Sequence, residues 1–126
     1  MSGQQRIKAA PSASLDGADR IVVDLTAAGI TAGIFRVDGK LYAYENTCPH
    51  QGGPVCQGLR IDAVRELLND SSAPAGFAFD PGDPRIVCPW HGFEFSVKTG
   101  CHPGNPAIRL NAIPVEEEGG VLYVRI

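Results

Sequence analysis

Two short segments of this chain each place one cysteine beside one histidine. The pairs are Cys48 with His50 in the sequence CPHQGG, and Cys88 with His91 in the sequence CPWHG. In both segments a proline directly follows the cysteine and a glycine lies just after the histidine. Such loops can turn both side chains toward one point, and the glycines let backbone N–H groups approach whatever lies there. The four side chains are therefore candidate ligands of a single metal centre.

Two cysteines and two histidines suit two kinds of metal site. One is a structural Zn²⁺ in a tetrahedral Cys₂His₂ site. The other is a [2Fe–2S] cluster in which two histidines replace two cysteines on one iron. A zinc finger usually keeps its cysteines together and its histidines together, whereas here each segment contributes one of each. The mixed pairs favour the two-iron cluster, with both cysteines on one iron and both histidines on the other; a chance pairing of unrelated residues is the least favoured interpretation.

The size and charge of the chain exclude several classes of function. The chain has 126 residues, which is enough for one domain over 1–126 and too few for two. A net charge of -3 argues against nucleic-acid binding, and no apolar run approaches the ~18 residues of a membrane span. Residues 1–19 lack the continuous apolar core of a signal peptide. We therefore expect a cytoplasmic protein, a monomer by default, that binds neither nucleic acid nor membrane.

Glycine and proline are abundant, at 15 and 10 residues, and this favours a β-rich fold with many tight turns. Runs of β-branched and aromatic residues between turn signals predict an all-β chain. The expected strands lie at 6–10, 20–25, 34–37, 40–44, 85–87, 93–97, 107–115 and 121–126. The strongest hairpin signal is the Asp38-Gly39 pair, which suits a two-residue turn. Outside the first expected strand, residues 1–19 are predicted to form a loose N-terminal arm.

The segment 57–84 interrupts this strand pattern between the two cysteine segments. Within it, the apolar residues of IDAVRELL at 61–68 recur at helical spacing, so we expect one short amphipathic helix. The sequence DPGDP at 80–84 predicts a turn. Such an insertion would either offer a partner-docking surface or pack its apolar face on the body of the protein.

At this point the sequence resembles the Rieske family of iron–sulfur proteins. The motifs CPH-x-GG and CPWHG look like the two cluster-binding loops of that family. Three further segments also resemble it: KLYAYEN at 40–46, FEFSVKTG at 93–100, and the proline-containing loop PGNPA at 103–107. Together the resemblance covers residues of about 20–56 and 85–126. The segment 57–84 is a departure, because it is longer than the link between the loops of a minimal Rieske ferredoxin.

The resemblance implies a fold, a cofactor and a set of site residues. The fold is an antiparallel β-sandwich with the cluster-binding loops at one tip. The cofactor is a [2Fe–2S] cluster, held by the ligands Cys48, His50, Cys88 and His91. The residues expected around it are Gly53, Trp90, Gly92 and Pro103.

The neighbours of the ligands indicate which kind of Rieske site this is. Members from respiratory cytochrome complexes carry a disulfide beside the cluster, and its two positions match Gly53 and Trp90 here. Those members also place a serine and a tyrosine hydroxyl near the cluster, where this chain has Phe93 and Phe95. Because Gly53 and Trp90 replace the two cysteines, no such disulfide is expected. Hydrogen bonds to the cluster sulfurs raise the reduction potential, so the loss of the two hydroxyl donors predicts a low potential.

The resemblance implies a low-potential one-electron carrier that passes electrons from a reductase to a terminal oxygenase or a similar enzyme. An alternative is the small [2Fe–2S] subunit of a nitrite reductase-like complex, and a less favoured one is a zinc-stabilised Cys₂His₂ interaction module. Catalytic subunits of Rieske oxygenases need a further iron held by two histidines and a carboxylate. After His50 and His91 only His102 remains in the chain. We therefore expect an electron-transfer protein and not an enzyme.

The remaining reactive residue types have simpler interpretations. Cys56 and Cys101 are predicted to be unpaired thiols, and His102 is predicted to be an exposed turn histidine. The acidic run at 116–118 is predicted to be a solvated face before a Gly-Gly turn, with an acidic docking patch as its alternative.

Overall fold

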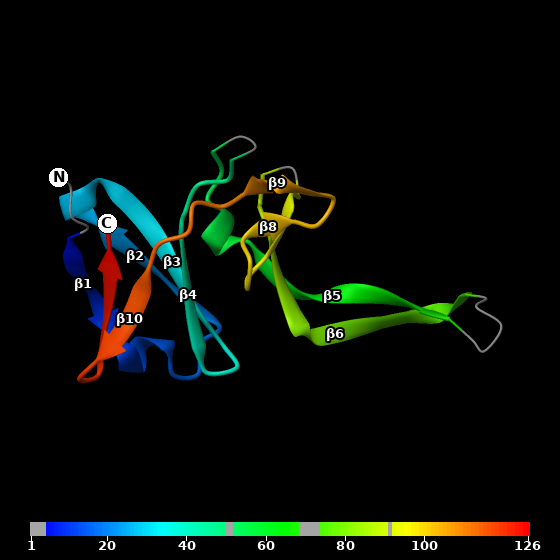
Figure 1. The fold of residues 1–126 in the computed structure, drawn as a ribbon, viewed down its shortest axis with the longest axis horizontal. Helices are drawn as coiled ribbons and strands as arrows, with labels where there is room; N and C mark the ends of the chain where they lie inside the picture. The colour runs from blue at the N-terminus through cyan, green and yellow to red at the C-terminus, as the bar shows by residue number, and fades with distance from the viewer. Residues whose placement is uncertain (1–4, 50–51, 69–73, 91) are drawn as a thin grey trace.

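A computed structural model of the chain describes residues 5–49, 52–68, 74–90 and 92–126. Over these residues the chain is almost entirely β-structure, with antiparallel sheets, short 3₁₀ turns and no α-helix (Figure 1). No helix among the described residues has the length and apolar character needed to cross a membrane. The prediction of an all-β fold with antiparallel sheets is confirmed.

Eleven strands are present in the described part of the chain. In chain order they are β1 (Arg6–Pro11), β2 (Arg20–Leu25), β3 (Ile30–Val37), β4 (Lys40–Glu45), β5 (Leu59–Leu68), β6 (Pro74–Val87), β7 (Glu94–Ser96), β8 (Cys101–His102), β9 (Asn105–Arg109), β10 (Val115–Glu118) and β11 (Val121–Arg125). The 3₁₀ turns are η1 (Ser12–Leu15), η2 (Thr26–Ala28) and η3 (Val55–Gln57). The sheets have the strand orders β1-β11-β10, β2-β3-β4, β5-β6-β7 and β8-β9.

The first two sheets form what we call the base of the molecule. They enclose an aliphatic core, here called the base core, whose buried members are Leu15, Leu25, Ala32, Ile34, Ala43, Ile113, Leu122 and Val124. The other two sheets and the cysteine-bearing loops lie beside the base. Figure 1 shows the β5–β6 hairpin extending away from the rest of the molecule. A second core, here called the site core, lies on this side; its buried members are Phe35, Val37, Tyr44, Cys48, Val55, Cys56, Ile86, Cys88, Phe95, Val97 and Leu110.

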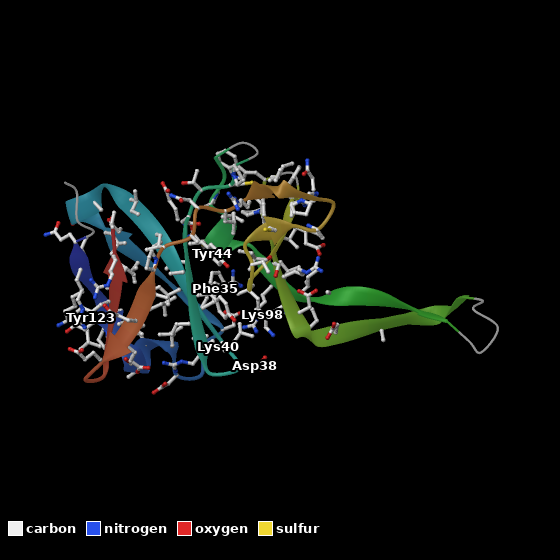
Figure 2. All side chains as sticks on the ribbon, viewed as in Figure 1. Phe35, Asp38, Lys40, Tyr44, Lys98 and Tyr123 are labelled. Atoms are coloured by element: carbon white, nitrogen blue, oxygen red, sulfur yellow. The ribbon has the colours of Figure 1, made fainter. Side chains whose placement is uncertain are left out.

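The β2-β3-β4 sheet separates the two cores because neighbouring residues of a strand point to opposite faces. On β3, Ile34 joins the base core and Phe35 joins the site core, and both are fully buried. On β4, Ala43 and Tyr44 divide in the same way. Figure 2 shows Phe35 and Tyr44 in the middle of the molecule, between the base and the second half. The sheet is therefore a wall shared by both cores.

The predicted β3–β4 hairpin is confirmed. Val37 pairs with Lys40, and the turn between them has positive φ at Asp38 (52°) and Gly39 (79°). Positive φ at both central residues is the requirement of a type I′ turn, which matches the twist of the flanking strands.

The predicted helix at 61–68 is wrong, because this segment is part of β5. Its backbone pairs with β6 along its length, from Leu59 opposite Val87 to Leu68 opposite Pro74. The first apolar residues of the segment also recur at every second position, as in a strand. The segment forms a strand because β6 supplies the partner for its backbone hydrogen bonds. The predicted turn at 80–84 is instead an irregularity within β6. Two neighbouring residues of β5 lie opposite Pro84 and Asp80, so the residues between these two are left out of the pairing.

Two other expectations need correction. The strand expected at 6–10 is present as β1, which pairs with β11, but the arm after it is not loose, because η1 follows directly and its Leu15 is only 3% exposed. The expected strand at 107–115 is divided between β9 and β10. Between these two strands, the Leu110 N–H donates to Gly100 and the Ile113 N–H donates to Ala43, so the chain crosses from the second half back to the base.

Candidate metal centre

The two cysteine loops, residues 48–53 and 88–93, are closed by matching backbone hydrogen bonds. In each loop the cysteine N–H donates to the carbonyl five residues later, at 2.8 Å in the first loop and 2.7 Å in the second. A glycine N–H donates back to the cysteine carbonyl, at 2.7 Å from Gly52 and 3.1 Å from Gly92. These glycines have φ of 76° and 70°, values that favour glycine. The glycines that both motifs share are therefore required by the closure of the loops.

Cys48 and Cys88, 40 residues apart in the sequence, both lie in the site core. Their residues are 2% and 1% exposed. Burial raises the pKa of the Cys88 thiol, the neighbouring Cys48 raises it further, and the Trp90 backbone N–H, which donates to the Cys88 sulfur, opposes this. Two buried thiols with a backbone donor aimed at the sulfur suit thiolate ligands, because a bound cation replaces the protons.

Gly53 allows the two loops to approach each other closely. A Cβ added at this position would lie 2.9 Å from the Cys88 Sγ and 2.8 Å from Cγ of Trp90. No side chain fits there, so the backbone of the first loop lies directly against the sulfur and the indole of the second. At Gly53 and Trp90, the two positions where the sequence predicts no disulfide, an indole packs on a glycine.

The described residues fit the thiolate half of a [2Fe–2S] site. Two buried cysteines, a backbone N–H donor and a glycine-lined approach are the features expected around one iron of such a cluster. His50 and His91, the expected ligands of the other iron, lie outside the described residues. Within the described ranges, no group of three or more potential ligand side chains gathers at one point.

An aromatic group packs beside the second cysteine loop. Phe93 lies against His102 with ring centroids 4.6 Å apart, and Phe95, which is fully buried, lies 6.0 Å from Phe93. His102 Nδ1 is 2.9 Å from the Glu94 carbonyl, to which an Nδ1–H donates. The expectation of an exposed turn histidine is therefore wrong, because His102 is half-buried and anchored to β7. Neither phenylalanine can donate a hydrogen bond to the site.

The other residues expected around the site are exposed. Trp90 is 50% exposed, Gly92 is exposed at the end of the second loop, and Pro103 is exposed in the turn that joins β8 to β9. Trp90 therefore covers Gly53 with one part of its ring and presents another to solvent.

A buried ion-pair group was not expected from the sequence. Arg85 on β6, only 9% exposed, pairs with Asp83 at 2.8 Å and with Glu94 on β7 at 2.5 Å. Hydrogen bonding to Asp83, and then to Glu94, raises the Arg85 pKa against the opposing effect of burial. The group ties β6 to β7 on either side of the second cysteine loop. Asp83 lies on the same strand as Arg85, whereas the register between β6 and β7 brings Glu94 to them.

Cys56 and Cys101 are free thiols, as predicted. Cys56 is fully buried against Gly33, with its Sγ 3.6 Å from the Tyr44 carbonyl. Burial raises the pKa of this thiol to about 12. Cys56 is therefore an inert core residue at neutral pH.

The acidic run at 116–118 is neutralised by arginines of the base. Its ion pairs join Glu116 to Arg6 and Arg125, Glu117 to Arg36, and Glu118 to Arg6, over 2.7–3.6 Å. Paired carboxylates of this kind are typical of a solvated sheet face rather than of an acidic docking patch.

Comparisons with known proteins place the chain in one family. The sequence model of the Rieske [2Fe-2S] domain matches residues 5–114. The chain is 25% identical over 122 residues to the 3-phenylpropionate/cinnamic acid dioxygenase ferredoxin subunit of Escherichia coli (strain K12), covering 94% of this chain and 92% of that protein.

Solved structures show the same fold. A chain in a complex of reduced oxygenase and oxidized ferredoxin in carbazole 1,9a-dioxygenase has a TM-score of 0.65 and 25% identity, covering 95% of this chain and 92% of that chain. A putative NADH-dependent nitrite reductase small subunit from Mycobacterium tuberculosis has a TM-score of 0.69 and 18% identity, covering 98% of this chain and 96% of that chain.

Proposed function

Because this chain belongs to the Rieske [2Fe–2S] domain family and its cofactor is a [2Fe–2S] cluster, we propose that it is a one-electron carrier and not an enzyme. We propose Cys48 and Cys88 as the ligands of one iron, and His50 and His91 as the ligands of the other. When bound, such a cluster supplies reversible one-electron transfer. The observation that carries the proposal is the burial of both cysteines in one core, on two loops that are closed in the same way and meet where Gly53 packs against the Cys88 sulfur.

The residues of the chain would bind, shield and orient the cofactor. The two buried cysteines would supply the sulfur ligands, and the close packing of Gly53 on Trp90 would exclude water from the thiolate side. We propose that redox partners dock over His50 and His91, because exposed ligand edges shorten the distance for electron transfer.

We propose a potential in the lower part of the Rieske range of about −150 to +300 mV. The support is that both side chains expected near the cluster are phenylalanines, which have no hydrogen-bond donor. Phe93 packs on His102, and Phe95 is buried in the site core. A protein-film or dye-coupled titration measures this potential. A value in the upper half of the range would contradict the proposal.

We propose a reductase as the electron donor and a terminal oxygenase as the acceptor, both in the cytoplasm. The support is the relative named as a ferredoxin subunit of a dioxygenase, together with the oxygenase–ferredoxin complex of carbazole 1,9a-dioxygenase. Reconstitution with candidate reductases and oxygenases tests the pairing through the rate of electron transfer from NAD(P)H.

A second candidate is the small subunit of a nitrite reductase-type complex. The observation that favours it is the similarity to the Mycobacterium tuberculosis protein along nearly the whole chain. At 18% identity this similarity concerns the fold alone, so the carrier proposal stands first. Stable co-purification with a large catalytic subunit would favour this candidate, whereas a carrier of the ferredoxin type forms transient complexes.

Visible absorbance and EPR of the purified protein test the function. We expect a red-brown protein that bleaches on dithionite and gives a reduced-state EPR signal; a colourless, EPR-silent zinc protein would refute the proposal. The variants His50→Ala and His91→Ala should lose this spectrum and retain the β-sheet circular dichroism. The matched control is Cys101→Ser, which removes a half-buried free thiol outside the proposed ligand set and should keep the spectrum.

A further inference from the structure

Arg20 on β2 connects the base to the turn that follows the first cysteine loop. Its Nη1 is 2.8 Å from the carbonyl oxygen of Cys56 in η3, and the same nitrogen also donates to the carbonyl of Gly58. The side chain of Arg20 is only 17% exposed. Hydrogen bonds from a charged donor are stronger than neutral ones, and these two end on carbonyls of the segment that leads from the site to β5.

The guanidinium of Arg20 is itself held in place. Asp19 accepts from Nε at 3.2 Å and from Nη2 at 3.3 Å, so the carboxylate fixes the plane of the group. The guanidinium carbon lies 5.9 Å from the centre of the Phe35 ring, which is fully buried in the site core. Arg20 therefore presents its donors from a defined position on the shared β2-β3-β4 sheet.

The peptide groups that flank Cys56 are held from both sides. Its N–H donates to Asn46 Oδ1 at 2.8 Å, while its carbonyl accepts from Arg20. Asn46 also donates from Nδ2 to Gln57 Oε1 at 3.0 Å. The Cys56 side chain fills the space that Gly33 leaves open, so η3 cannot move without breaking contacts with the base.

The two carbonyls that Arg20 binds are each connected to one of the cysteine loops. On the first side, the N–H of Val55 in η3 donates to the Gly53 carbonyl, and the Cys48 N–H donates to the same oxygen, both at 2.8 Å. On the second side, Gly58 packs directly against the carbonyl of Val87, the residue before Cys88. A shift of η3 would therefore change how the first loop meets the second.

We propose that Arg20 is a positioning residue of the metal centre, which sets the relative position of Cys48 and Cys88 by holding the carbonyls of Cys56 and Gly58. The inference rests on the proposed function, since a [2Fe–2S] cluster requires the two sulfurs at a defined spacing. The residue touches neither cysteine and acts through η3.

The test compares Arg20→Met, Arg20→Lys and Arg36→Met in the purified holoprotein. Arg20→Met removes both charged donors and keeps a long side chain, whereas Arg20→Lys keeps one ammonium donor. Arg36→Met is the control, because Arg36 on β3 pairs with Asp16 and Glu117 in the base. We expect Arg20→Met to broaden and shift the reduced-state EPR signal and to speed cluster loss about tenfold. Arg20→Lys should recover part of both changes, and Arg36→Met should match the wild type.

A measurement on the cluster-free chain separates positioning from cofactor affinity. Amide hydrogen exchange at Cys48 and Val55 should be faster in Arg20→Met than in the wild type, because the support of η3 is lost. A wild-type EPR signal and rate of cluster loss in Arg20→Met would overturn the inference and leave the proposed function intact; an equal change in Arg36→Met would also overturn it. If Arg20→Met does not fold, Arg20→Lys carries the same comparison. A wild-type protein that holds no cluster would instead refute the proposed function, and the inference with it.

Discussion

The base core and the site core lie on opposite faces of one sheet and are held together by different means. All buried members of the base core are aliphatic, so this core is stabilised by the burial of apolar side chains. The site core contains three cysteines and Tyr44, whose hydroxyl donates to the Val97 carbonyl at 2.7 Å. Hydrogen bonds and close glycine contacts have narrow geometric tolerances, whereas aliphatic packing tolerates conservative change. The difference indicates that the base provides stability and that the second half provides a defined site geometry.

The strongest test of this division is the substitution Leu122→Ala. Leu122 on β11 is fully buried in the base core, and its truncation should lower the free energy of unfolding by about 2–5 kcal/mol. The reduced-state EPR signal should not change, because no member of the site core is affected. Urea unfolding followed by circular dichroism, with EPR on the same sample, measures both. A changed EPR signal would show that the two cores are not separable.

Compared with Leu122→Ala, the substitution Gly53→Ala should lower the free energy of unfolding less and should disturb the metal centre more. The added methyl group would collide with the Cys88 sulfur and the Trp90 ring, and we expect a loss of about 1–3 kcal/mol together with a lower cluster content. The matched control is Gly82→Ala in β6, where a Cβ would meet only Asp80 Oδ1, at 3.3 Å. Iron and sulfide analysis measures the cluster content. Equal results for the two variants would argue against a tight contact at Gly53.

The smallest effect concerns Cys56 and appears only at alkaline pH. The folded-state pKa of this thiol is raised to about 12 from an ordinary value of 9.0, so the thiol stays protonated after the unfolded chain has begun to release its proton. The contribution to stability is therefore complete below pH 9 and is lost as the pH rises toward 12. Between pH 8 and pH 10 the expected loss is about 1 kcal/mol. Unfolding curves of Cys56→Ala should show a shallower pH dependence than the wild type, and parallel dependences would contradict the burial of the thiol.

Much of the site and the fold could be predicted from local chemistry. The Asp38-Gly39 turn was recognised because few residue pairs accept positive φ at both positions, and the structure has this conformation. The shared pattern of proline and glycine predicts that the two cysteines lie near each other, and both are buried in the site core. The histidine half of the ligand set stays a prediction.

Other features could not be predicted because they depend on partners that are distant in the sequence. The apolar residues at 61–68 suit a helix or a strand, and the choice depends on the presence of β6 to pair with them. His102 was assigned to an exposed turn because nothing near it in the sequence reveals the stacking on Phe93. Neither the strand at 61–68 nor the stacking of His102 on Phe93 follows from a pattern of residues close together in the sequence.

The sequence by itself determined the all-β class, the hairpin turn and the chemistry of the metal centre, because these follow from residue types at short spacings. Only the tertiary structure decided how the two cysteine loops are supported. Arg20 and Cys56 are 36 residues apart, and the hydrogen bond between them exists because η3 packs on β3, the neighbour of β2 in the shared sheet. Ligand types are local properties of a chain, whereas the position of a ligand is a property of everything packed around it.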